Sequence, residues 1–132
     1  MEVNSTDLFA GFAHPKDGNY TCIPNGFIEH ELSKIDNMAE LKVVLYAMRH
    51  TWGYQEYGMW KRISVDEFAH GRKRKNGERM DSGTGLGITA TKAGIKRAVE
   101  HGYLMAGFDR SDLARIQKYY YLRMQQEQAE TA

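Results

Sequence analysis

Apolar residues recur at helical spacing over residues 38–53, where they fall on a single face: Met38, Leu41, Val44, Leu45, Met48 and Trp52. Asn37 stands directly before this stretch as a helix N-cap, and Glu40 follows three residues later as the second half of a capping box. We therefore predict a helix that begins after Asn37 and ends near Gly53. Its opposite, polar face is expected to hold Glu40, Lys42, Arg49 and His50.

Two shorter helical patterns lie on either side of this helix. Residues 26–34 carry apolar side chains at helical spacing, which predicts a short first helix. Ser64 and Glu67 have the spacing of a second capping box, and acidic residues in a first turn also suit the helix dipole. A helix is therefore predicted over residues 65–70, and Gly71 ends it.

The last third of the chain predicts one helix followed by two strands, because helical spacing of apolar residues gives way to alternation of the two strand faces. A helix is predicted over residues 88–101, and Gly102 is the glycine expected after its end. Residues 103–108 and 116–124 are predicted to pair as a hairpin, since the second of them is rich in aromatic side chains. One face of that strand carries Ile116, Lys118, Tyr120, Leu122 and Met124, and the other carries Gln117, Tyr119, Tyr121 and Arg123.

The chain divides into a flexible arm over residues 1–19, a single domain over 20–124 and a polar tail over 125–132. The loop over residues 71–87 is glycine-rich, basic and long for a compact domain, and such loops are often functional or mobile.

Composition narrows the class of protein. Cys22 is the single cysteine among 132 residues, so no internal disulfide forms and a reducing, cytoplasmic setting is expected. The sequence has no apolar run near the length of about 20 residues that a membrane-spanning helix needs. We therefore expect no membrane partner.

Charge is balanced overall and uneven along the chain. Residues 1–59 carry a net charge of −4 and residues 60–124 a net charge of +7, although the whole chain has a formal net charge of +1. Such an excess indicates a polyanion partner. The alternative is a solvated basic loop, because four of the cations are consecutive at residues 72–75.

The order of elements predicts a small, mainly helical α+β fold of the winged helix-turn-helix type, with three to four helices and a C-terminal β-hairpin wing. In that arrangement the second helix of the pair enters the DNA major groove and the hairpin adds contacts. The candidate DNA-binding residues of the helix are Thr89, Lys92, Lys96 and Arg97. Those of the loop are Arg72, Lys73, Arg74, Lys75 and Arg79, and those of the wing are Arg110, Arg115, Lys118 and Arg123.

Two tyrosines interleave with the wing cations. Tyr119 and Tyr121 share the strand face of Arg123 and could contact a DNA backbone, stack on bases or cover the core. We favour core packing or a dimer contact for them.

Four stretches resemble, in order, the phage replication protein O N-terminal domain family, and the fold is also akin to the DnaD-like winged helix. The stretches are Pro24-Asn25-Gly26-Phe27, Arg49-His50-Thr51-Trp52-Gly53, Ile63-Ser64-Val65-Asp66-Glu67-Phe68-Ala69, and Thr84-Gly85-Leu86-Gly87 leading to Glu100-His101-Gly102-Tyr103. The resemblance covers about residues 20–104. It implies a duplex-DNA-binding domain of phage or plasmid type in replication initiation or replisome organisation, with a replicative helicase or its loader as partner. The loop around residues 72–77 is longer than the family's.

Other functions stay open. A transcriptional regulator on the same fold is one alternative, and a protein–protein adaptor that binds no DNA is another. The isolated aromatics of the arm, Phe9 and Phe12, and the tyrosine-rich last strand leave a homodimer open. We expect no enzyme, no cofactor and no metal, because the residues 83–87 do not match a nucleotide-binding glycine motif and the five histidines are scattered.

Overall fold

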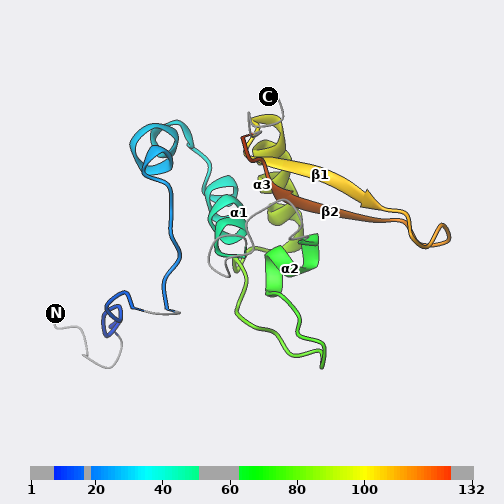
Figure 1. Ribbon diagram of the computed structural model, residues 1–132, viewed down its shortest axis with the longest axis horizontal. Helices are drawn as coiled ribbons and strands as arrows, with labels where there is room; N and C mark the ends of the chain where they lie inside the picture. The colour runs from blue at the N-terminus through cyan, green and yellow to red at the C-terminus, as the bar shows by residue number, and fades with distance from the viewer. Residues whose placement is uncertain (1–7, 17–18, 51–62, 126–132) are drawn as a thin grey trace, which may run out of the picture.

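The computed structural model describes residues 8–16, 19–50 and 63–125 of the chain. Its elements, in order, are η2 (Phe27–Glu31), η3 (Leu32–Lys34), α1 (Met38–Arg49), α2 (Val65–His70), α3 (Ile88–Glu100), β1 (Leu104–Asp109) and β2 (Gln117–Leu122). Figure 1 shows α1 and α3 side by side, with α2 below them and the β1–β2 hairpin projecting away from the body. The prediction of a small helical domain with a C-terminal hairpin is confirmed.

The core lies where α1 crosses α3. Gly94 of α3 touches the backbone of α1 so closely that an added Cβ would lie 2.7 Å from the carbonyl group of Ala39. Only glycine permits this approach. Around the crossing, the buried apolar cluster draws on every main element: Phe27, Val43, Val44, Tyr46, Ala47, Met48, Ile63, Phe68, Ile95, Ala98, Leu104, Tyr120 and Leu122.

Helix α1 begins as predicted and buries more of its surface than predicted, because Val44 and Met48 of the predicted apolar face are buried and Leu41 packs against the core. The Asn37 side chain accepts a hydrogen bond from the Glu40 backbone N–H at 2.9 Å, which confirms the cap. The predicted polar placement of Glu40 and His50 is wrong, because both are fully buried, whereas Met38 and Leu45 of the predicted apolar face are exposed. The physical reason is that α1 is also covered on its predicted polar side: α3 covers Glu40, and the loop that carries Asp81 covers His50. Trp52 and Gly53 lie outside the described residues.

The two shorter helices follow the sequence closely. Both hydrogen bonds of the Ser64–Glu67 capping box are present, and α2 ends at Gly71, whose φ of 112° few other residues adopt. The predicted helix at 26–34 forms as a π-helical turn followed by a 3-10 turn, not as an α-helix.

The hairpin is antiparallel, in a register that pairs Leu104 with Leu122 and Asp109 with Gln117. Its inner face buries Leu104, Tyr120 and Leu122. The backbone of Ile63 pairs with Tyr120 through two hydrogen bonds of 3.1 and 3.0 Å, so a third segment flanks β2.

The two tyrosines that flank Tyr120 do not enter this core. Tyr119 and Tyr121 are half-buried on the outer face, with ring centroids 6.1 Å apart, and the Tyr119 ring lies over Gly107, where a Cβ would be 2.7 Å from it. Core packing therefore belongs to Tyr120 and Leu122, and the expectation of it for Tyr119 and Tyr121 is wrong.

Candidate functional site

Three lysines from two elements border one surface groove. Lys92 and Lys96 come from α3, and Lys118 comes from β2. The groove encloses about 450 Å³ and has a mainly apolar lining of Val65, Ile95, Val99, Ala106 and Tyr120, with Glu100 at its border. We call it the lysine groove.

Helical and strand periodicity explain this convergence. Thr91, Gly94, Ile95 and Ala98 are the buried residues of α3, which leaves Lys92 and Lys96 exposed. In β2, Lys118 shares the face of Tyr120, and its ammonium group lies 5.6 Å from the Tyr120 ring centroid and 5.7 Å from that of Phe108. Within the part of the chain that the structure describes, none of the three ammonium groups forms an ion pair.

Arg97, the fourth residue that the sequence assigns to the DNA-reading helix, forms ion pairs within the protein. Its guanidinium group lies 3.1 Å from the Asp36 carboxylate and 3.6 Å from Oε1 of the fully buried Glu40. The other Glu40 oxygen lies 2.7 Å from Nδ1 of His101. Arg97 and His101 therefore both face the buried carboxyl group of Glu40, and these contacts tie α3 to α1.

The basic loop is an ordered hairpin over residues 72–80, which we call the basic hairpin. Lys73 pairs with Arg79 as a β-bridge, and the Arg74 and Met80 N–H groups donate to the carbonyl oxygens of Glu78 and Arg72, each at 2.8 Å. In Figure 1 it extends below α2 as a narrow loop. Residues 73–79 are exposed, so the loop is solvated as the alternative expected and has the form of a hairpin.

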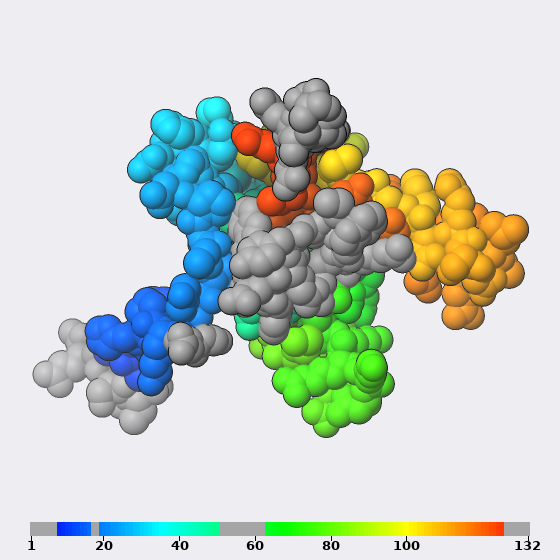
Figure 2. Space-filling model, viewed as in Figure 1, coloured from blue at the N-terminus to red at the C-terminus, as the bar shows by residue number. Residues whose placement is uncertain are grey.

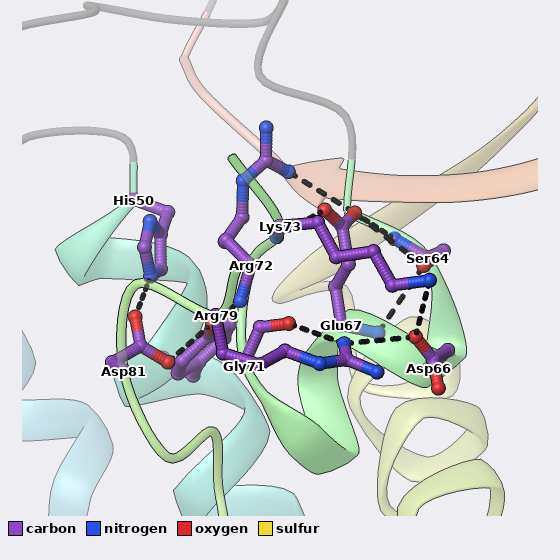
Figure 3. Close-up of polar contacts among 10 residues, drawn as sticks. His50, Ser64, Asp66, Glu67, Gly71, Arg72, Lys73, Arg79 and Asp81 are labelled. Atoms are coloured by element: carbon purple, nitrogen blue, oxygen red, sulfur yellow. Dashed lines mark hydrogen bonds and ion pairs between the residues drawn. The ribbon is translucent and has the colours of Figure 1, made fainter. Parts of the chain in front are cut away.

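Most cations of the basic hairpin pair with acidic residues in the first turn of α2, as Figure 3 shows. Arg72 lies 3.4 Å from Glu67, and Arg79 lies 2.9 Å from Asp66 while also donating to the Gly71 carbonyl at 2.7 Å. The hydrogen bond from Arg79 lowers the pKa of Asp66. Lys73 is 4.0 Å from the same carboxylate.

The two cations at the tip of the basic hairpin differ from these three. Arg74 and Lys75 are exposed, and no ion pair to either is present among the described residues.

Asp81 anchors the base of the basic hairpin to α1. Its Oδ1 accepts from the Tyr46 hydroxyl at 2.8 Å and from the Gly83 N–H at 2.9 Å, and its Oδ2 lies 2.8 Å from Nε2 of His50. The Tyr46 hydroxyl in turn accepts from the Arg72 N–H at 2.9 Å. Figure 3 shows His50 and Asp81 facing each other at one side of the hairpin base.

The pKa values of this cluster favour a neutral imidazole beside an ionised carboxylate. Burial lowers the pKa of His50, more than the facing carboxylate raises it. Burial would raise the pKa of Asp81, but the hydrogen bonds from Gly83, Tyr46 and His50 outweigh it and the net direction is down. Burial and the bond to Asp81 raise the pKa of Tyr46. Because an ionised carboxylate only accepts, Nε2 of His50 carries the proton in this contact.

The remaining predicted residues lie apart from one another. Thr89 is exposed in the first turn of α3. Arg110 and Arg115 are exposed in the connection between the strands, and the Arg110 guanidinium lies 5.2 Å from the Phe108 ring centroid. Arg123 is exposed beyond the other end of β2, beside Gly102.

Sequence reasoning missed the Asp81 cluster. Tyr46 and His50 stand four residues apart on α1, a spacing that places both on one face, but their partner lies more than thirty residues later. No local signal connects them.

Comparison with known proteins adds no relative: no protein-family model, curated protein or solved structure matches this chain. In the described segments, no three His, Cys, Asp or Glu side chains gather as metal ligands, and no helix has the length and apolarity to cross a membrane.

Proposed function

We propose that this chain is a winged-helix protein that binds double-stranded DNA, with α3 in the major groove and the β1–β2 hairpin as the wing. The element order supports the proposal, because a short helix, a connection, a longer helix and a hairpin follow one another as in that fold. The Ile63–Tyr120 pairing also supports it, since it joins the segment before α2 to the wing.

The observation that carries the proposal is the set of three lysines without ion pairs at the lysine groove. Two elements far apart in sequence present Lys92, Lys96 and Lys118 to one surface, and phosphate contacts supply most of the affinity in protein–DNA complexes. Beside them the first turns of α3 expose Ile88, which is 40% exposed, together with the small side chains of Thr89, Ala90 and Ala93. Small side chains let a helix approach base edges closely, and the Thr89 hydroxyl can donate or accept there.

We further propose a role in DNA replication, with a replicative helicase or its loader as a partner. The support is the resemblance of residues 20–104 to the phage replication protein O N-terminal domain. Footprinting on genomic DNA separates this role from transcriptional regulation. Repeated sites along one duplex favour replication, whereas one palindrome with half-sites a helical turn apart favours a regulator.

Duplex binding is tested by fluorescence anisotropy over a series of salt concentrations. Each phosphate contact contributes about 0.9 to the slope of log affinity against log salt, so Lys92→Ala/Lys96→Ala/Lys118→Ala should lower the slope by about 2.7. Lys42→Ala, an exposed lysine on α1 outside the groove and without an ion pair among the described residues, is the matched control and should leave the slope unchanged. Absence of binding at low salt, or equal slopes for the triple variant and the wild type, would refute the proposal.

A further inference from the structure

The N-terminal arm presents an aromatic pair to solvent. Phe9 and Phe12 are 69% and 91% exposed, and their ring centroids lie 4.6 Å apart. Leu8 beside them is 58% exposed. Figure 1 and Figure 2 show this arm, in dark blue, standing away from the helical body. Adjacent apolar side chains exposed to this degree mark an interaction site more often than a random surface.

The arm and the lysine groove are complementary in polarity and in charge. Residues 1–12 carry two acidic side chains, Glu2 and Asp7, and no basic one. The groove has a mainly apolar lining and is bordered by three lysines and one glutamate. Its volume of about 450 Å³ falls in the range of sites that enclose small ligands. An acidic segment with two aromatic side chains therefore matches the groove in both respects.

We propose that the arm of one copy docks in the lysine groove of a second copy, and that the two copies exchange arms reciprocally. The arm joins the body at η2, beside α1, whereas the groove lies between α3 and the hairpin on the other side of the body (Figure 1). A partner copy therefore offers the groove without requiring the arm to cross its own domain. A two-fold exchange fills both grooves and buries both arms, which closes the assembly as a dimer.

Docking of the arm would also regulate the groove. Lys92, Lys96 and Lys118 are the proposed DNA contacts, so arm and DNA would compete for the same three ammonium groups. This consequence rests on the proposed function, whereas the arm exchange itself does not. The dimer should therefore be the form that does not bind DNA, and duplex DNA should convert it to monomers.

The exchange is tested on the full chain by analytical ultracentrifugation over a concentration series. Full burial of one phenylalanine side chain corresponds to roughly a tenfold to hundredfold change in an equilibrium constant. Phe9→Ala/Phe12→Ala should therefore weaken dimerisation by about a hundredfold or more. Lys92→Glu/Lys96→Glu should weaken it as well, through charge repulsion with the arm. Met38→Ala and Lys75→Glu, exposed positions outside both surfaces, are the matched controls and should leave the dimer intact.

Mixing the two weakened variants distinguishes exchange from other forms of association. The first variant keeps an intact groove and the second an intact arm, so one arm–groove contact should re-form and produce a heterodimer. A wild type that stays monomeric at all concentrations would overturn the proposal, and so would an arm docked in its own groove. A dimer that survives both sets of substitutions, or a mixture that fails to associate, would overturn it equally.

DNA titration is measured separately, so that the two proposals fail independently. If the lysine groove binds DNA, Phe9→Ala/Phe12→Ala should bind duplex DNA more tightly than the wild type does. A dimer that dissociates as predicted in a protein without DNA affinity would refute the proposed function and leave the arm exchange standing. If the protein binds duplex DNA but never dimerises, the arm exchange is refuted and the proposed function stands.

Discussion

The basic hairpin and the lysine groove are two cationic regions of one small domain, and they use their charges differently. The basic hairpin holds five cations in the sequence of residues 72–79, and three of them face carboxylates of α2. The lysine groove holds only three, and none has an ion-pair partner among the described residues. The denser run of charge is therefore the more compensated one.

This difference shows that the density of charge in a sequence is a poor guide to the charge that a surface offers. Asp66 and Glu67 are explained by the start of α2, where acidic residues favour the helix dipole and Glu67 completes the capping box. The fold then uses the same two carboxylates to hold the hairpin that follows. The sequence assigns Lys92 and Lys118 to two separate elements, the helix and the wing, and they reach one groove only because the hairpin returns beside α3.

The largest expected effect follows from how firmly the basic hairpin is built into the fold. A Cβ at Gly71 would clash with the Asp81 carbonyl oxygen, and the residue has a φ of 112°. Gly71→Ala should therefore lower the free energy of unfolding by about 3 kcal/mol, since strain and a backbone clash add. Urea denaturation followed by circular dichroism measures it.

Gly77→Ala is the control that isolates the clash. Gly77 also has a positive φ, of 90°, but nothing lies within 4 Å of the position of its Cβ. This variant should lose only about 1 kcal/mol, the cost of the left-handed conformation. Equal losses at the two glycines would mean that the base of the hairpin is not packed against Asp81. Lys92→Ala/Lys96→Ala, at the lysine groove, should stay within about 0.5 kcal/mol of the wild type.

Local signals predicted the fold better than they predicted the site. The caps at Asn37 and Ser64 and the glycine stops at Gly71 and Gly102 depend on neighbouring residues, and the helices and strands formed within a few positions of the prediction. Burial of Glu40 depends on His101, which is 61 residues later, and on Arg97. A periodicity argument places such a residue on the polar face because it cannot include a partner from another helix.

The second prediction compares the paired and unpaired cations of the basic hairpin directly. If the tip contacts phosphates, Arg74→Ala/Lys75→Ala should lower the salt slope of duplex binding by about 1.8, at about 0.9 for each contact. Arg72→Ala/Arg79→Ala removes the same formal charge from positions that face Glu67 and Asp66. That variant should leave the slope nearly unchanged and cost up to about 1 kcal/mol of stability for each ion pair. Equal changes in slope for the two variants would show that arginines paired with α2 contact phosphates as well as unpaired cations do.

The smallest expected effect concerns pH and the contact between His50 and Asp81 at the base of the basic hairpin. His50 is fully buried, and burial lowers its pKa below the value of about 6.5 that it has in the unfolded chain. A lowered pKa means that the unfolded chain binds the proton more readily. The stability that neutral His50 contributes is therefore complete above about pH 6.5 and is lost as the pH falls toward the folded pKa.

Asp81 extends this dependence to lower pH. Its pKa is lowered in the fold, so the stability from its ionised form is present above about pH 4 and is lost below it. Urea denaturation at intervals from pH 7.5 to 5 should show a decrease on the order of 1 kcal/mol that His50→Gln removes, although this variant is less stable at pH 7.5. His70→Gln, at the exposed end of α2, is the control for loss of an imidazole and should keep the decrease. The anchor of the basic hairpin would then weaken with acid. A decrease that persists in His50→Gln would show that the contact between His50 and Asp81 does not cause the pH dependence.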